Sequence, residues 1–240
     1  MIILNLGSGP RTSPHCVNID WSPYLRLKRN PLASRVAPLF LTGKRRERFL
    51  ALDRNVLVHD LRQALPMPDG SADAVYHSHV LEHFDRQLVP AFLAEIRRVL
   101  KPGGVHRVVV PDLEASCRRY LDHVDRCMDH PEAMGDHDDH VAALIEQMVR
   151  REATGSSAQP PFRRRFENWL FGDARRRGET HQWMYDSINL TTTLEAAGFR
   201  EIVKVDYRSS AIPIWDEIQL DRTQDGVEYI PGSLYMEGRA

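Results

Sequence analysis

The chain has 240 residues, of which 42% are hydrophobic and 27% are charged, and its net charge is −1. This composition is typical of a folded protein with a sizeable core. The near-zero charge gives no electrostatic indication of nucleic-acid binding, and the absence of a run of about 18 apolar residues excludes a predicted transmembrane helix. The first ten residues, MIILNLGSGP, have neither a basic region nor a cleavage site, so they predict a strand and not a signal peptide.

Cysteine usage indicates a reducing compartment. Cys16, Cys117 and Cys127 are too few and too scattered for a disulfide framework or a CxxC metal site. We therefore expect a cytoplasmic protein.

The first half of the chain predicts strands that alternate with turns or helices. Strands are expected at residues 2–6, 17–19, 55–59, 72–78 and 105–110. Residues 21–54 are irregular and locally basic, and predict one helix and a mobile loop. From Leu88 the apolar residues recur at helical spacing until Lys101-Pro102-Gly103-Gly104 ends the helix. Alternation of this kind predicts a mostly parallel sheet that is covered on both faces.

The second half begins with a long interruption of the sheet. Residues 113–153 look helical, broken by a polar stretch at 129–140. A helix is expected at 191–197, and strands at 201–205 and 233–237. The roughly 75 residues between the fifth and sixth strands are too many for an unstructured connecting loop, so we expect them to have structure of their own and to carry function.

The ends of the early strands carry residues that suit an adenosine-type cofactor. A glycine turn, Gly7-Ser8-Gly9, follows the first strand, and Asp20 and Asp60 follow the second and third. Ligands bind at the carboxyl ends of parallel strands, and Asp20 could accept hydrogen bonds from both hydroxyls of a ribose. Each feature alone is common in turns and caps. The missing third glycine and the short first crossover weaken a dinucleotide interpretation.

Successive motifs resemble those of the class I S-adenosylmethionine (SAM) dependent methyltransferases. These motifs are Leu4–Gly9, Asn18–Asp20, His59–Leu61, Asp73–Tyr76 with Leu81–His83, Arg98–Gly104, and Leu194–Phe199. The resemblance covers about residues 2–112 and 181–206. It implies a seven-stranded Rossmann-like α/β sheet, SAM as cofactor and S-adenosylhomocysteine as product, and it says nothing about the acceptor.

The resemblance also implies residue roles, which we carry over as expectations. Gly7, Ser8 and Gly9 would shape the loop under the methionine part of SAM, with Asn5 beneath it. Asp20 would bind the ribose, with Trp21 beside the adenine, and Asp60 and Leu61 would also contact the adenine. Ser78 and His79 would lie near the methionine end of the cofactor. Asn5 replaces the family's usual acidic residue, which keeps a hydrogen-bonding group but removes the charge.

The segment His79-Val80-Leu81-Glu82-His83 allows three interpretations. His79 or His83 could be a general base for an acceptor hydroxyl, since methyl transfer depends mainly on positioning and a histidine suits that task. His83 could instead only pack the strand–helix junction. The third alternative is a zinc peptidase, because the letters H-x-x-E-H also spell a metal motif whose histidines share a face on a helix.

Further residues are candidates for the acceptor side. His181 and Tyr185 could contact the acceptor, or could form a hydrogen-bonded turn with buried aromatics. Arginine runs at 163–165 and 175–177 could bind an anionic acceptor or form solvated faces. The stretch DHDDH at 136–140 could bind a divalent ion, but an exposed flexible loop is favoured. The basic segment 26–48 could touch an anionic membrane surface.

The sequence therefore predicts one methyltransferase domain over 1–240. It consists of a cofactor-binding core (1–112), a helical acceptor-binding insertion (113–190) and C-terminal strands that complete the sheet (191–240). The expected reaction is methylation of an oxygen of a saccharide or other small metabolite, without a bound metal. The alternative is a SAM-binding or regulatory protein that has lost turnover.

Overall fold

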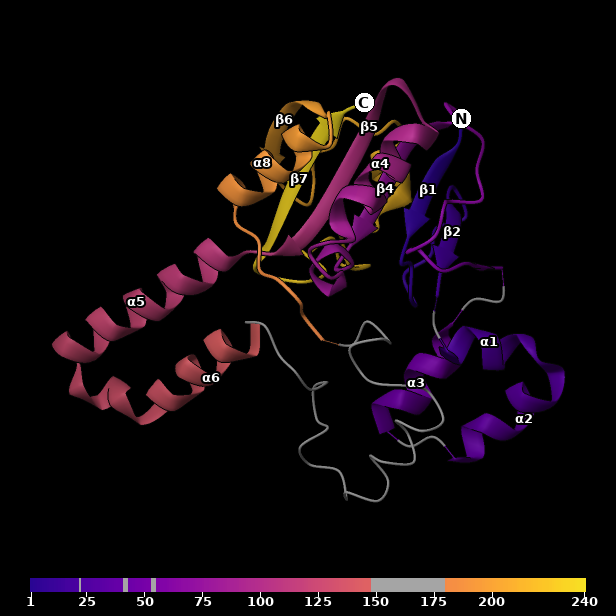
Figure 1. Ribbon diagram of the computed structural model, residues 1–240. Helices are drawn as coiled ribbons and strands as arrows, with labels where there is room; N and C mark the ends of the chain where they lie inside the picture. Colours follow the sequence, from indigo (N-terminus) through magenta and orange to yellow (C-terminus); the bar gives the residue numbers. More distant parts are fainter. Residues whose placement is uncertain (22, 41–42, 53–54, 148–179) are drawn as a thin grey trace.

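A seven-stranded sheet forms the centre of the molecule (Figure 1). The computed structural model describes residues 1–21, 23–40, 43–52, 55–147 and 180–240. The strand order is β3-β2-β1-β4-β5-β7-β6, and β7 runs antiparallel to both β5 and β6 while the other neighbours are parallel. The strands are β1 (Ile3–Leu6), β2 (Val17–Asp20), β3 (Leu57–Val58), β4 (Ala72–Ser78), β5 (Leu100–Pro111), β6 (Arg200–Val205) and β7 (Ser233–Arg239). The predicted Rossmann-like fold is confirmed.

Helices cover both faces of the sheet and extend beyond it. They are α1 (Pro23–Arg29), α2 (Pro31–Phe40), α3 (Gly43–Ala51), the 3-10 turn η1 (Leu81–His83), α4 (Val89–Val99), α5 (Leu113–Asp129), the 3-10 helix η2 (Pro131–Asp136), α6 (His137–Gln147), α8 (Ser187–Ala196) and α9 (Trp215–Ile218). None of the helices in the described residues is long and apolar enough to cross a membrane.

The sheet is buried on both faces because alternate residues of its strands belong to different apolar clusters. In β5, Val108 and Val110 join the cluster under α4 and α8, whereas Val105 and Val109 join the one that contains Trp215 of α9. Both clusters exclude water from the strands, so the strands consist largely of apolar residues, as their sequences predicted.

Two regions differ from the prediction. Residues 21–54 hold three helices in the described part, where one helix and a loop were expected. Proline and glycine interrupt the helical period in the sequence, since α2 contains Pro38 and α3 begins at Gly43. Leu25 and Phe49 are among the few that are buried there. The third strand is reduced to Leu57–Val58. At the other end, α8 begins four residues earlier than predicted, because Asp186 forms a capping box with Asn189.

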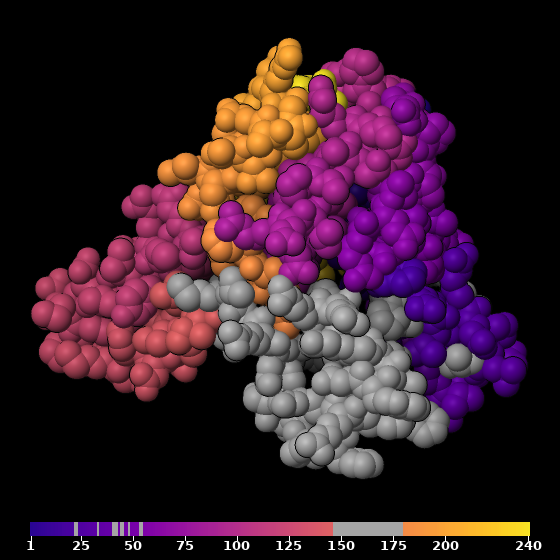
Figure 2. Space-filling model, viewed as in Figure 1, coloured from indigo at the N-terminus to yellow at the C-terminus, as the bar shows by residue number. Residues whose placement is uncertain are grey.

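The insertion leaves the sheet after β5 and forms a helical arm. Helices α5 and α6, joined by η2, stand out from the rest of the molecule (Figure 1), and the space-filling view shows them at its edge (Figure 2). The stretch 136–140, which we expected to be an exposed loop, is the end of η2 and the first turn of α6. That expectation was wrong because the acidic residues of this stretch occupy a helix N-terminus, where their charge is favourable.

A buried arginine joins the antiparallel edge of the sheet to the segment before β7. The Arg107 side chain is fully buried, and its guanidinium lies 2.8 Å from both Asp221 and Glu237. It also donates to the carbonyl oxygens of Asp206 and Ser209. Every charge in this network thus has a partner, which is the condition under which buried charges are tolerated.

Replacing Arg107 with methionine should lower the free energy of unfolding by about 3–5 kcal/mol, because two buried carboxylates lose their counter-charge. Urea unfolding measures the change. The matched control is Arg118→Met, which breaks the exposed pair with Glu114 and should change the midpoint little. Equal midpoint shifts in the two variants would contradict this role for the buried network.

Candidate active site

The loop after β1 folds back on the end of β2. Gly7 has a φ of 67° and donates from its backbone to Ile19 O at 2.8 Å, and Gly9 has a φ of 50° and donates to Asp20 Oδ2 at 3.0 Å. A Cβ on Gly7 would lie 2.3 Å from Cγ2 of Val80. The glycines therefore allow the left-handed backbone and bring this loop against the segment that follows β4.

Asp20 lies at the centre of this loop. Besides the bond from Gly9, its Oδ1 accepts from Trp21 N at 2.6 Å. Burial raises the pKa of Asp20, and the two backbone bonds oppose that rise. An ionised carboxylate has about four acceptor positions, so two backbone bonds leave room for the two hydroxyls of a ribose.

Two buried polar atoms near these strand ends have no hydrogen-bond partner among the described residues. They are Ser8 Oγ, in the glycine loop, and His59 Nε2, just after β3. The backbone N–H of His59 donates to Asp20 O at 3.0 Å. Orphaned polar groups beside an accepting carboxylate fit a site that a polar ligand such as the SAM nucleoside completes. Asn5 is only 2% exposed, and its amide donates to Arg11 O and Asn18 Oδ1, each at 2.9 Å, which fixes the loop from below.

The predicted adenine side is more open. Trp21 is 37% exposed and its ring lies 5.1 Å from the guanidinium of Arg26. Asp60 accepts two side-chain bonds from Arg62; desolvation raises the pKa of Asp60, but these bonds outweigh it and the net shift is downward. Leu61 is buried in the main core. Asp60 is thus charged and held by Arg62.

His79 follows Ser78, the last residue of β4, in a constrained conformation. Its φ is 53°, a left-handed value that a residue without a special role rarely adopts. The backbone N–H donates to Val109 O at 2.9 Å. The ring is held on both sides, with Nδ1 3.1 Å from Glu82 Oε1 and Nε2 3.0 Å from Ser233 Oγ.

Glu82 is a fully buried carboxylate beside two imidazoles. His79 is the nearer, and His83 Nε2 lies 3.9 Å from the same oxygen. Burial raises the pKa of Glu82, but the contact with His79 and the charges of His79 and His83 outweigh it, and the pKa falls to about 2. Glu82 therefore remains ionised and favours a proton on the imidazole nitrogen that faces it.

The segment that returns from the insertion packs on this carboxylate residue. The backbone N–H of Gln182 donates to Glu82 O at 2.6 Å, and the His181 ring stands edge-on to His83 with centroids 5.0 Å apart. Tyr185 is buried, and desolvation followed by the charge of Glu82 raises its pKa to about 12. The structure thus brings together all four predicted catalytic candidates, His79, His83, His181 and Tyr185, around Glu82.

Residues His79–His83, which match H-x-x-E-H in sequence, do not form the helical zinc-peptidase motif. A helix would place both histidines on one face, but His79 is a left-handed residue after a strand, and Leu81–His83 form a single 3-10 turn. Glu82 contacts the histidines instead of facing a water site.

Sequence reasoning did not identify Ser233, the partner of His79 Nε2. It lies 154 positions away, and no local pattern marks it. The arginine runs at 163–165 and 175–177, with the apolar stretch 166–171 between them, lie outside the described residues.

Comparison with known proteins supports the same class. Residues 15–108 match a family model described as a methyltransferase domain. The comparison with curated proteins found no match. Among solved structures, the chain is similar to a SAM-dependent methyltransferase from Mesorhizobium loti (16% identity, covering 100% of this chain and 90% of that one, TM-score 0.42). A SAM-dependent methyltransferase from Archaeoglobus fulgidus is also similar (15%, 99% and 85%, TM-score 0.41).

A third similar structure is the Haloferax volcanii methyltransferase solved in complex with the activator Trm112 (17% identity, 100% and 82% covered, TM-score 0.42). With identities this low, acceptors and partners remain properties of those proteins.

The strand order and the match of residues 15–108 to a methyltransferase-domain model support a SAM-dependent methyltransferase domain. The resemblance to the class I SAM-dependent methyltransferases is confirmed, and with it SAM as the cofactor.

Replacing Asp20 with alanine should weaken SAM binding about 10- to 100-fold, because hydrogen bonds to a charged group contribute about 1.5–3 kcal/mol. Calorimetric titration with SAM measures the dissociation constant. Asp122→Ala, an exposed aspartate on α5, is the control and should bind as the parent does. Unchanged affinity in Asp20→Ala would exclude this residue from the cofactor site.

The depressed pKa of Glu82 predicts a pH-dependent contribution to stability. Its folded value of about 2 lies below the ordinary value of 4.5, so the contribution is present above pH 4.5 and is lost as the pH falls toward 2. Glu82→Gln should therefore be destabilised relative to the parent at pH 6, and the gap in urea midpoints should narrow toward pH 3. Glu195→Gln, at an exposed site on α8, should show no such trend. A gap that stays constant with pH would contradict the assignment.

Proposed function

We propose that the protein transfers the methyl group of SAM to a hydroxyl oxygen of a saccharide or other small metabolite, with His79 as general base. The observation that carries this proposal is the placement of the His79 imidazole. It lies at the carboxyl end of β4, between the buried carboxylate of Glu82 and the hydroxyl of Ser233. A base is useful when the nucleophile is an alcohol, which is a poor nucleophile until its proton is removed.

Glu82 would set the tautomer of that base. A carboxylate beside Nδ1 favours a proton there and leaves the lone pair on Nε2. Ser233 Oγ currently donates to Ile230 O at 2.8 Å and lies at hydrogen-bond distance from Nε2. An acceptor hydroxyl that takes the place of Ser233 at Nε2 would lose its proton to His79 as the oxygen–methyl bond forms. SAM supplies the methyl group as a sulfonium and leaves as S-adenosylhomocysteine.

The acceptor side would be formed by the segment 181–185 and the insertion that precedes it. His181 and Tyr185 lie beside the Glu82 cluster, and Arg86 lies over the Trp183 ring at 3.9 Å. Imidazole, phenol and aromatic faces are groups that hydrogen-bond and stack on a polar ring such as a sugar.

We expect His79→Asn to reduce kcat about 100- to 10,000-fold, the range that a general base contributes. Asparagine tolerates the left-handed backbone at this position, so the loop should keep its shape. The assay measures S-adenosylhomocysteine formation with a panel of monosaccharides and nucleotide sugars.

His15→Asn, at an exposed histidine that faces Glu217, is the matched control and should leave the rate unchanged. A His79→Asn enzyme that keeps its full rate would exclude His79 as the base. SAM binding without turnover on any acceptor would favour the alternative of a non-catalytic SAM-binding protein.

A further inference from the structure

The helical arm lacks an apolar interior of its own. None of the three apolar clusters in the described residues includes a side chain from residues 113–147. Two large apolar side chains of α5 point outward: Leu121 is 57% exposed and Met128 is 77% exposed. A small unit that stands apart from the main core, as the arm does in Figures 1 and 2, needs another source of stability.

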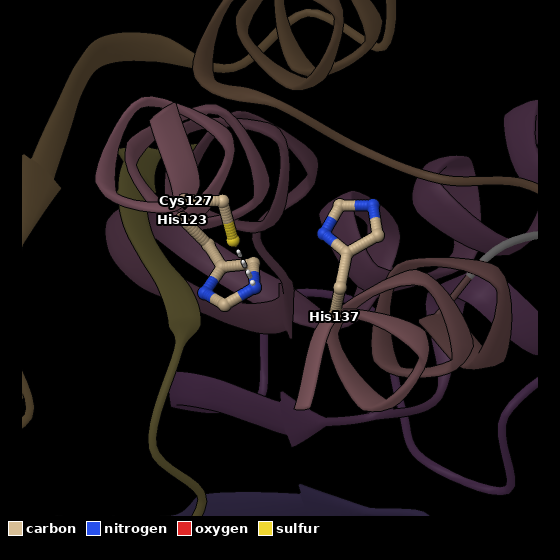
Figure 3. A group of neighbouring side chains, drawn as sticks. All are labelled: His123, Cys127 and His137. Carbon is tan, nitrogen blue, oxygen red and sulfur yellow. Dashed lines mark hydrogen bonds between the residues drawn. The ribbon is translucent and has the colours of Figure 1, made fainter. Parts of the chain in front are cut away.

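Polar metal-binding side chains occupy the interior instead. On α5 the buried residues are Ser116, His123 and Cys127, and the last two are one helical turn apart. Figure 3 shows both side chains directed toward His137, the first residue of α6. The Sγ of Cys127 lies 3.3 Å from His123 Nε2, and the rings of His123 and His137 have centroids 5.3 Å apart.

One of these groups lacks a partner. The Nδ1 atom of His137 is buried and has no hydrogen-bond partner among the described residues. A buried imidazole nitrogen without a partner is costly, and here it belongs to a ring that lies across from a thiol and a second imidazole. The orphaned atom therefore points to a missing ligand between the two helices.

The spacing of these groups suits a tetrahedral ion. One ligand atom from each of His123, Cys127 and His137 lies within 4.8 Å of the others. Zinc–nitrogen distances of about 2.0 Å and zinc–sulfur distances of about 2.3 Å place neighbouring tetrahedral ligands about 3.3–3.6 Å apart. The sulfur–nitrogen distance of 3.3 Å already has this value, and the ligand atom of His137 lies within 4.8 Å of the other two.

A fourth ligand is available from the same helix junction. His140 stacks on His123 with ring centroids 3.7 Å apart and an interplanar angle of 6°, and Asp136 Oδ1 lies 3.8 Å from His123 Nε2. His123, Asp136 and His140 form a second group within 4.8 Å.

We propose that His123, Cys127 and His137, with His140 or Asp136 as the fourth ligand, bind one zinc ion that joins α5 to α6. A thiolate with imidazoles selects zinc or a similar borderline ion over magnesium or calcium, which prefer oxygen ligands. The site is structural: it closes the arm in place of an apolar core, and it is separate from the cofactor loop.

The test is metal analysis of the full-length chain, purified without a metal-affinity tag. We expect about one zinc ion per chain, as in other structural sites with one tetrahedral ion, and loss of the metal in Cys127→Ser and in His137→Ala. Cys117→Ser, which removes a thiol from the same helix outside the cluster, is the matched control and should keep the metal. His140→Ala and Asp136→Ala test the fourth ligand, because the variant that loses the metal identifies it.

Cobalt titration gives a readout that does not depend on folding yield. The thiolate-to-cobalt charge-transfer band should appear in the parent and in Cys117→Ser and be absent in Cys127→Ser, while SAM binding is retained in all three.

Metal in the parent that survives Cys127→Ser and disappears in His181→Ala would assign the ion to the Glu82–His83–His181 group and overturn the proposal. A parent that binds neither zinc nor cobalt would overturn it as well. Neither readout depends on turnover, so the result is independent of the proposed reaction.

Discussion

The burial of one carboxylate constrains the whole candidate site. Glu82 is inaccessible to water, so its charge must be compensated by groups that the fold brings to it. His79 at the end of β4 and His83 on η1 lie beside this carboxylate. The backbone oxygen of Glu82 also accepts a hydrogen bond from the N–H of Gln182. The end of β4 and the segment that returns from the insertion thus meet at one residue.

This arrangement explains why the cofactor loop and the histidine cluster are mechanically connected. Gly7 packs against Val80, and Val80 lies between His79 and the 3-10 turn that carries Glu82. The glycine loop and the His79 imidazole are therefore joined by one residue, Val80, which packs against the loop and directly follows His79 in the chain. The antiparallel edge contributes at the same point, because Ser233 at the start of β7 contacts the His79 ring.

The sheet was predictable because its strands are buried on both faces and bounded by turn residues. β1, β2 and β4 appear within a residue of the predicted ranges. The pairing of His79 with Ser233 was not predictable, since it depends on β7 inserting between β5 and β6, and nothing local encodes strand order. The helices before β3 were missed because proline and glycine interrupt the helical period of this segment. The His123–Cys127–His137 cluster has only a weak sequence signal. His123 and Cys127 are four residues apart on α5, and the stretch DHDDH at 136–140 lies at the end of η2 and the start of α6, which the fold places beside α5.

The insertion enters and leaves the sheet at a single point, and this determines how freely it can vary. Asp112 and Tyr185 form a parallel bridge, and the backbone N–H of Leu113 donates to Tyr185 O at 2.9 Å. Once the two ends of a long loop are fixed together, doubling its length costs only about 0.6 kcal/mol in closure entropy. The sheet and its cofactor loop are therefore thermodynamically insulated from the length of the arm. The arm could therefore differ in length while the strand order stays intact.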